Sequence, residues 1–570
     1  MKLPAITEFM NWSWDKIKPY YDELASREVT AATVEEWLSD WSLLSDYIHE
    51  TASRLHVATT VDTTDKEAEE RFNRFIEEVM PPARKADQRL KEKLLASGLT
   101  PKGFEIPLRN MKAEAELFRE ENLPLMVEEQ KLRNEYNRVV GAQTVEWRYK
   151  EYTISQLRPF LQSPDRELRE EVWRLMLGRQ VKDRGPLTEI WDALLDLRQQ
   201  IAANAGKPDY RAYIWQAYTR FDYTPDDCKA FHKAIEEVVV PAAAQILEKR
   251  RQRLGVQTLR PWDLEVDPEG RPPLRPFQTV EELQEKTDAI FHHVDPQLGD
   301  YYHIMREEHL LDLENRKGKA PGGYCTAFPV SKRPFIFMNA VGVHDDVQTM
   351  LHESGHAFHD FEMFNNPDLR YSQQRDIPME FAEVASMSME LLAAPYLTKD
   401  YGGFYTPAEA ARARIEHLER SILFWPYMAV VDAFQHWVYE HPEEAHDPAI
   451  CDGVWGNLWR RFMPVVDWSG LEDFMVSGWM RKLHIFQYPF YYIEYGLSQL
   501  GAVQVWANSL KDQAAAVKAY RRALSLGYTV PLPELYATAG AKFAMDAATL
   551  RTAVDLMMKT IEELESLAKE

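Results

Sequence analysis

Two histidines and a glutamate stand at a spacing that can bind and use a metal ion. The stretch His352-Glu353-Ser354-Gly355-His356 follows the pattern His-Glu-x-x-His within a segment that we predict to be helical. Histidines four residues apart project from one face of a helix, so both imidazoles can reach the same ion. The intervening Glu353 can act as a base toward a water molecule that zinc activates. This pattern is typical of zinc hydrolases.

A catalytic zinc site usually takes three protein ligands, so a third ligand is expected outside the pentad. The metzincin pattern would require glycine at 359 and histidine at 362, where this chain has His359 and Glu362. The common aminopeptidase spacing would require glutamate at 375, which is Arg375. We therefore expect a carboxylate from the next helix, and the candidates are Asp376, Glu380, Glu383 and Glu390.

Burial separates some of these carboxylates. Asp376 precedes Ile377-Pro378 and is expected to cap the helix predicted from Pro378 to about Ala394. That helix is rich in apolar residues, and a carboxylate on a buried helix is costly unless it is paired or binds a metal. Glu383, in the middle of the helix, is our preferred ligand, and Glu390 can orient a histidine from behind. Spacing alone does not separate Glu380 from Glu383.

A second group of chemically useful side chains lies between His484 and Tyr495, where four tyrosines and one histidine fall within twelve residues. Tyrosines in a helical stripe are more often core residues than catalytic ones. Beside a zinc peptidase site, however, phenol and imidazole groups can donate to an oxyanion. Tyr488 and Tyr495 are seven residues apart, which would place both on one face of a helix, and Tyr491 and Tyr492 remain possible substitutes.

The pentad must be positioned by the elements around it. We predict a helix from Asp345 to about Phe361, with Asp345 as its N-cap and Gln348 completing a capping box. Two short strands, at 322–328 and 334–339, run directly into this helix. The edge of such a sheet can pair with an extended peptide, or the hairpin can simply support the helix, and the sequence leaves both open.

The rest of the chain reads as helices. Long amphipathic patterns fill residues 15–140, a small hairpin is predicted between Gly141 and Thr153, and a helix begins at Ser163-Pro164-Asp165 with the proline just inside its cap. Residues 255–276 are predicted to form an ordered loop. We divide the chain into an N-terminal helical region (1–140), a helical middle region (141–310) and a catalytic region (311–570).

Composition limits the function. A formal net charge of -23 argues against nucleic acid as a partner. The three cysteines, Cys228, Cys325 and Cys451, are too far apart in sequence for a disulfide framework or a metal knuckle, which fits a reducing compartment. The segment Met1–Glu8 lacks the apolar core of a signal peptide, and no apolar run approaches membrane-spanning length. We therefore expect a cytoplasmic protein that does not bind membranes.

Three segments of the chain resemble a known family of peptidases. The segments 350–359 and 380–386 resemble the oligoendopeptidase F and thimet oligopeptidase family of zinc metallopeptidases, and 320–325 is similar to the strand region of that family. The resemblance implies that His352, His356 and Glu383 bind one zinc ion and that Glu353 is the base. It also implies roles for His484, Tyr488 and Tyr495 toward the substrate and transition state. The interval from His484 to Tyr488 is one residue shorter than in the thimet branch, which leaves the role of His484 open.

The resemblance further implies a fold and a reaction. The expected fold is a mostly α-helical ellipsoid with a deep substrate channel and a small β-sheet beside the active-site helix. The expected reaction is hydrolysis of internal bonds in short peptides. Alternatives are another zinc hydrolase, such as an aminopeptidase, and a non-catalytic zinc- or peptide-binding scaffold. The sequence leaves open the peptide length limit, the cleavage preference, and whether the protein is a monomer or a homo-oligomer.

Overall fold

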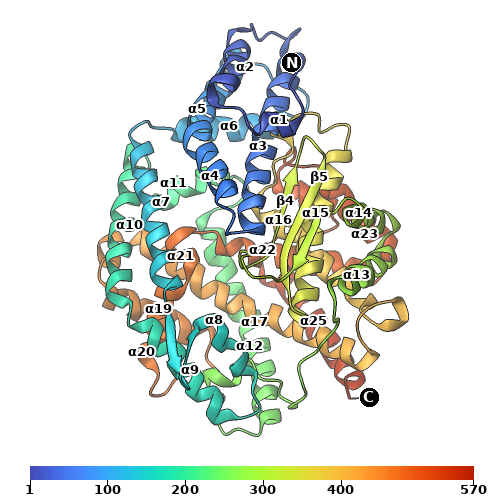
Figure 1. Cartoon of the computed structure of the whole chain (residues 1–570). Helices are drawn as coiled ribbons and strands as arrows, with labels where there is room; N and C mark the ends of the chain where they lie inside the picture. Colours follow the sequence, from blue (N-terminus) through green and yellow to red (C-terminus); the bar gives the residue numbers. More distant parts are fainter. Residues whose placement is uncertain (570) are drawn as a thin grey trace.

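The computed structural model describes residues 1–569, and helices dominate every part of it (Figure 1). The first six helices gather at one end of the molecule, with α3 as the longest among them, whereas α7 lies beside α10. Their bounds are α1 (Ile6–Phe9), α2 (Trp14–Ser26), α3 (Val34–Val61), α4 (Lys66–Arg74), α5 (Met80–Ser97), α6 (Glu105–Leu117) and α7 (Asn122–Gly141).

The middle of the chain opens with the predicted hairpin, in which β1 (Thr144–Trp147) pairs antiparallel with β2 (Lys150–Thr153). The helix expected near 163 begins two residues later than predicted, because the Asp165 carboxylate, rather than Ser163, caps it and Pro164 lies outside. The helices that follow are α8 (Ile154–Leu157), α9 (Arg166–Val181), α10 (Arg184–Asn204), α11 (Tyr210–Ala217), α12 (Pro225–Leu254), α13 (Val280–Val294) and α14 (Pro296–Glu307).

A three-stranded sheet precedes the pentad helix, as the two predicted strands indicated. β4 (Tyr324–Phe328) pairs antiparallel with β5 (Arg333–Ala340), and Cys325 lies opposite Ile336. The sequence analysis missed a third strand, β3 (Leu311–Glu314), which pairs parallel with β5. The strand order β3-β5-β4 leaves β4 at an edge of the sheet.

The remaining helices complete the body. The pentad lies on α15 (His344–Asn365), which packs against α16 (Met379–Ala393), and α16 packs in turn against α22 (Tyr492–Ser509). The other helices are α17 (Pro407–Glu440), α18 (Pro442–Ala445), α19 (Pro448–Phe462), α20 (Glu472–Val476), α21 (Leu483–Gln487), α23 (Gln513–Leu524), α24 (Leu532–Thr538) and α25 (Ala547–Leu567). The predicted fold class, mostly α with a small sheet beside the active-site helix, is confirmed.

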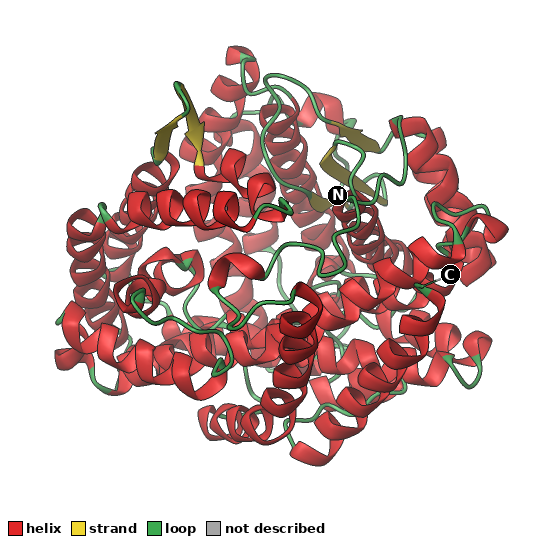
Figure 2. Ribbon diagram, turned by 90° about the horizontal axis from the view of Figure 1, so that it is seen from below, coloured by secondary structure: helices red, strands yellow, loops and turns green. Residues whose placement is uncertain are grey.

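The two largest hydrophobic cores organise most of these elements. The larger one runs from Leu117 to Leu564 and joins the middle helices to α15, α16, α17 and α22. A separate core, with Trp37, Trp41 and Leu90 among its members, holds the N-terminal helices together. The view from below shows helices surrounding the molecule, with strands confined to two small places (Figure 2). The exact boundaries of the three regions stay a prediction.

Within residues 1–569, none of the helices is both long enough and apolar enough to cross a lipid bilayer.

Candidate metal centre

The helix that carries the pentad has Val343, not the predicted Asp345, at its N-cap position. The Asp346 carboxylate, not that of Asp345, accepts hydrogen bonds from the backbone N–H groups of Val341, Gly342 and Val343 at 2.8, 2.8 and 2.9 Å. Asp345 instead lies at the surface and pairs with Arg420. Because the chain turns sharply before α15, the carboxylate one residue later faces the free N–H groups.

The next helix also begins differently from the prediction. Pro378 occupies the N-cap position of α16, and no side chain caps the helix. Asp376 is therefore not the cap. Its carboxylate lines a cavity, where burial raises its pKa to about 6. It does not join the histidines of the pentad in a possible metal-binding group.

A glycine lets α15 and α16 come close enough to share a site. A Cβ atom on Gly355 would lie 2.5 Å from the Ser386 Cα and 2.6 Å from the Ala385 carbonyl oxygen, closer than real Cβ atoms approach. The fourth residue of the pentad therefore touches the backbone of α16. This contact places Glu383 of α16 opposite the two histidines.

His352, His356 and Glu383 form the group that best fits a metal ion. The Nε2 atoms of the two histidines lie 3.2 and 3.6 Å from Glu383 Oε2. All three ligand atoms lie within 4.8 Å of one another. The imidazoles are 27% and 25% exposed, so an ion can reach them from the open side. Two imidazoles and one carboxylate that leave a position open are a donor set suited to catalytic zinc.

Electrostatics in this group favour a bound cation. Burial alone would raise the pKa of Glu383, yet the hydrogen bond to His352 and the nearby His356 lower it to about 2. Burial lowers the pKa of His356 to about 4, so at neutral pH that ring is neutral and can offer a lone pair. An ionised carboxylate beside a neutral imidazole is the state in which both bind metal.

Glu353 lies on the same helix but is held apart from the ligands. Its side chain is buried, and burial raises its pKa to about 7, with a further contribution from the charge of Glu383. His352 and a hydrogen bond from the backbone N–H of Cys325, in β4, oppose that rise. A carboxylate with a pKa near neutrality can both accept and return a proton.

Behind the ligands, Glu390 connects two histidines. Its Oε1 lies 2.6 Å from His352 Nδ1, and its Oε2 lies 2.9 Å from Nε2 of His417, on α17. Burial alone would raise the pKa of Glu390, but these contacts lower it to about 2. The contact with His352 directs that ring's Nε2 toward Glu383, which is the orienting role expected for Glu390.

Glu380, which spacing could not separate from Glu383, contacts other residues than the two histidines. Its Oε1 accepts a hydrogen bond from the Tyr223 hydroxyl at 2.8 Å and lies 3.4 Å from Arg220 Nε. Arg220 also pairs with Glu494, and both of these side chains are fully buried. Glu380 thus belongs to a buried ion-pair network in which its charge is already balanced.

The aromatic segment does not form the single helix that the seven-residue spacing predicted. α21 ends at Gln487 and α22 begins at Tyr492, and between them Phe490 adopts a left-handed backbone with φ of 63°. Tyr488 is 45% exposed. The His484 ring nevertheless lies 6.3 Å from that of Tyr488 and 6.0 Å from that of Tyr495, between ring centres.

Two tyrosines lie within the electrostatic reach of the proposed ligand Glu383. Burial, followed by the charge of Glu383, raises the pKa of Tyr495 to about 12. Tyr491, whose ring centre lies 5.3 Å from that of Tyr495, is also shifted upward by burial and by nearby carboxylates that include Glu383. Both phenols therefore keep their protons at neutral pH and can donate hydrogen bonds.

Two buried arginines anchor the aromatic segment through its carbonyl groups. Arg198 donates to the carbonyl oxygens of Ile485 and Phe486, and Arg220 donates to that of Phe490 at 2.7 Å. The Gln435 side chain accepts from the Phe490 N–H at 2.8 Å. These bonds satisfy a backbone that has left regular helical structure.

A cavity of about 420 Å³ lies between the N-terminal helices and the end of α15. Its lining includes Trp41 of α3, Lys91 of α5, Ala327 of β4 and Asp360 of α15. The pKa of the Cys325 thiol, in the same strand as Ala327, is raised by burial and by the charges of Asp360 and Glu353.

Comparison with known proteins decides the family. The model described as "Peptidase family M3" matches residues 160–554, and "Peptidase M3 N-terminal domain" matches residues 7–105. The chain belongs to peptidase family M3.

Relatives within this family are distant in sequence. The chain is 21% identical to an oligoendopeptidase F homolog of Borreliella burgdorferi over 72% of its own length and 65% of that protein. It is 22% identical to the oligopeptidase PepF of Bacillus subtilis over 50% of its length and 42% of that protein. The match thus spans less than two thirds of either relative.

A solved structure resembles the whole chain. PZ peptidase A with an inhibitor superposes with a TM-score of 0.87 at 26% identity, covering 98% of this chain and 100% of the other. The M3 fold therefore extends over the N-terminal helices as well as the region that contains the pentad.

Sequence reasoning missed several residues of this M3 site. His417 reaches the metal centre through Glu390, whereas Arg198 and Arg220 contact the carbonyl groups of the aromatic segment, and the fold alone brings these distant residues there. An arginine on a helix gives no sign in sequence of being buried. Pro489 was a usable signal, because a proline inside the predicted tyrosine helix indicates a break.

Proposed function

We propose that this chain is a zinc-dependent endopeptidase that hydrolyses internal bonds of short peptides. The observation that carries the proposal is the convergence of His352, His356 and Glu383 beside a buried Glu353 with a pKa near neutrality. Membership of peptidase family M3 supports the reaction class, and the names of the oligoendopeptidase F relatives support cleavage of oligopeptides.

The three ligands have supports that suit the proposed role. The Ser386 hydroxyl donates to Glu383 Oε2 at 2.9 Å, and Glu390 fixes the ring of His352. When bound, zinc would supply Lewis acidity, which lowers the pKa of a coordinated water and polarises the scissile carbonyl.

Glu353 is proposed to move the proton. As the general base it would take a proton from the attacking water and later give it to the leaving amine. This exchange balances the reaction: the C–N bond breaks, a C–O bond forms, and the amine leaves protonated. A pKa of about 7 in the folded chain suits both halves of the transfer.

Phenols and imidazole are proposed to stabilise the oxyanion. Tyr495 and Tyr491 keep their protons and lie near Glu383, while His484 is packed among the tyrosine rings. Tyr488 is more exposed and is proposed to contact the substrate when it binds. Donors aimed at the developing charge contribute about 10²–10³-fold to rate in comparable sites.

The peptide is proposed to run along β4 into the cavity. β4 is an edge strand, its Cys325 N–H bonds to Glu353, and Ala327 lines the cavity. An extended peptide can pair with such an edge through its backbone, which explains how varied sequences would be held in one register.

The test is the substitution Glu353→Gln. Loss of the base should lower kcat by about 10²–10⁴-fold while zinc stays bound, because the three ligands are unchanged. Hydrolysis of an internally quenched peptide and zinc content by mass spectrometry provide the two readouts. Asp345→Asn, an exposed change on the same helix, should keep both. Undiminished hydrolysis by Glu353→Gln would rule out the proposed mechanism.

A further inference from the structure

A second cluster of metal-binding side chains lies between α12 and α17, outside the site described above. Cys228 and His232 are one helical turn apart on α12, and Asp432 and His436 are one turn apart on α17. The two helices pack against each other, which brings these side chains into one part of the interior. All four are buried, with exposures of 0%, 5%, 0% and 2%.

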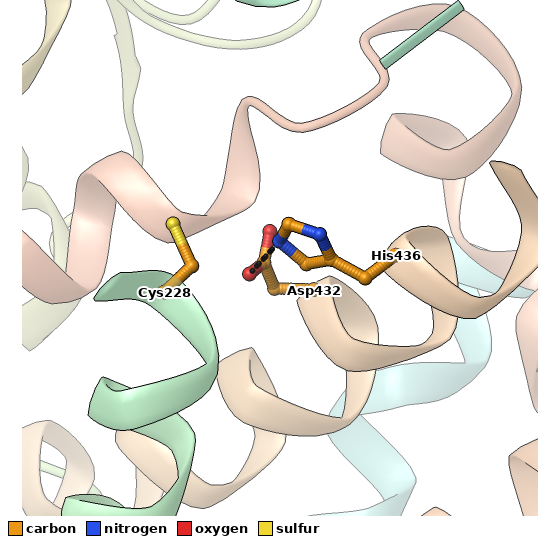
Figure 3. A group of neighbouring side chains, drawn as sticks. All are labelled: Cys228, Asp432 and His436. Atoms are coloured by element: carbon orange, nitrogen blue, oxygen red, sulfur yellow. Dashed lines mark ion pairs between the residues drawn. The ribbon is translucent and has the colours of Figure 1, made fainter. Parts of the chain in front are cut away.

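The Asp432 carboxylate is the centre of the cluster. Its Oδ2 lies 2.8 Å from His232 Nε2 and 3.3 Å from His436 Nε2. Ligand atoms of Cys228, Asp432 and His436 all lie within 4.8 Å of one another. Figure 3 shows the carboxylate between the thiol and the imidazole, with the side chains coming from facing helices.

The hydrogen bonds within this cluster are incomplete. Among the described residues, Asp432 Oδ1 and His436 Nε2 are buried atoms without a hydrogen-bond partner. Leaving such atoms unpaired is unfavourable, and more so for a charged group. The ion pairs of Asp432 in the same part of the chain are with the two imidazoles alone, and Arg211, 3.4 Å from His436 Nδ1, is paired with Glu440. A cation bound in the cluster would satisfy these orphaned atoms.

The donor set indicates which cation. Cys228, Asp432 and His436 offer one thiolate, one carboxylate and one imidazole, a donor combination that suits Zn²⁺. His232, whose Nε2 lies 2.8 Å from Asp432 Oδ2, holds that carboxylate in place. The three ligands are at most 2% exposed, so no substrate can reach an ion between them and its role would be structural. We propose that Cys228, Asp432 and His436 bind a structural zinc ion. Binding would require the Cys228 thiol to lose its proton, which is released to solvent.

This ion would also support the aromatic segment. The His436 ring centre lies 5.1 Å from that of Phe490, the residue with the left-handed backbone. The neighbouring Gln435 accepts the Phe490 N–H. A zinc ion that fixes α17 to α12 would therefore hold the surface on which the tyrosine-bearing turn rests.

Metal counting tests the proposal on the full-length, zinc-loaded protein. Wild type should contain about two zinc ions per chain, and Cys228→Ala and His352→Ala should each contain about one. Cys451→Ala is the matched control: Cys451 is equally buried but donates to the Ala445 carbonyl oxygen, and its variant should keep both ions. About one ion in wild type, unchanged in Cys228→Ala, would overturn the proposal.

Cobalt substitution gives a readout that needs no variant to fold. Wild type loaded with Co²⁺ should show the near-ultraviolet charge-transfer band of a thiolate–cobalt bond. The band should persist in His352→Ala and in Cys451→Ala and disappear in Cys228→Ala. A cobalt-loaded wild type without that band would overturn the assignment of Cys228, whatever its metal count. Because His352→Ala removes only the site formed with His356 and Glu383, the experiment distinguishes a failure of that proposal from a failure of the proposed Cys228 site.

Discussion

Glu390 shows how a single residue behind a metal ligand can shape the site. It contacts His352 with one oxygen and His417 with the other, at 2.6 and 2.9 Å. Its charge therefore supports the proton on His352 Nδ1 and leaves Nε2 free for the metal. His417 in turn fixes the carboxylate of Glu390. The orientation of His352 therefore depends on α17, a helix that provides no metal ligand.

We predict that Glu390→Gln weakens zinc binding about 10–100-fold, because the amide loses the charge that His352 and His417 share. Competition with a chromogenic chelator measures the affinity. Glu416→Gln is the control, since Glu416 precedes His417 but pairs with Arg420. Equal zinc affinity in wild type and both variants would show that the Glu390 contact has no orienting role.

The buried carboxyl group of Asp360 should make the stability of the fold depend on pH. Its carboxyl lines the cavity, and burial raises its pKa from 3.8 to about 7. Between those values the unfolded chain loses the proton and the folded chain keeps it, so the free energy of unfolding falls as pH rises from about 4 to about 7.

Asp360→Asn should remove that part of the slope, which we put at roughly 1 kcal/mol because solvent reaches the cavity. Urea unfolding at several pH values provides the measurement. Asp368→Asn, at an exposed carboxylate, should keep the wild-type slope. Parallel pH profiles for wild type and Asp360→Asn would contradict the shifted pKa.

At the scale of elements, the site depends on how closely α15 and α16 pack. Gly355→Ala would push a methyl group into the backbone at Ala385 and Ser386 and displace Glu383. We predict a loss of about 1–3 kcal/mol in stability and weaker zinc binding, measured by denaturant unfolding and chelator competition. Gly178→Ala is the matched control: Gly178 lies in α9 with open space around it, so alanine there should be neutral or stabilising. A Gly355→Ala protein with wild-type stability and affinity would exclude this close contact.

The elements also show what sequence can and cannot predict. The pentad helix and its partner were predicted to within a few residues, because long apolar periodicities define both. Their caps were wrong, since Val343 and Pro378 occupy the N-cap positions assigned to Asp345 and Asp376. Which carboxylate reaches a free N–H depends on the exact turn that precedes the helix, and no spacing rule specifies that turn.

Residues contributed by helices distant in sequence could not be predicted. His417 and Arg198 are unremarkable positions on amphipathic helices, and only the packing of α17 and α10 brings them to the site. The seven-residue interval from Tyr488 to Tyr495 suggested one helical face, yet the chain breaks at Phe490 and both rings still approach His484. The resemblance predicted that these tyrosines and His484 lie near one another, but the break in the helix between them was not predicted.

At the scale of the whole molecule, the separate N-terminal core faces the region that carries the pentad. Its helices form one wall of the 420 Å³ cavity, and α15 with β4 forms the other. A volume of this size matches ordinary small-ligand sites and excludes a folded protein domain. If the proposed peptide path along β4 passes through this cavity, only short or extended chains would enter it.

Mass spectrometry of a defined peptide mixture after incubation with the zinc-loaded protein tests the proposed peptidase activity. We expect cuts at internal bonds of short peptides, loss of all cuts after chelation, recovery with added zinc, and no cleavage of a folded protein in the same mixture. An uncut mixture, removal of N-terminal residues alone, or cleavage that chelation leaves unchanged would contradict the proposed activity.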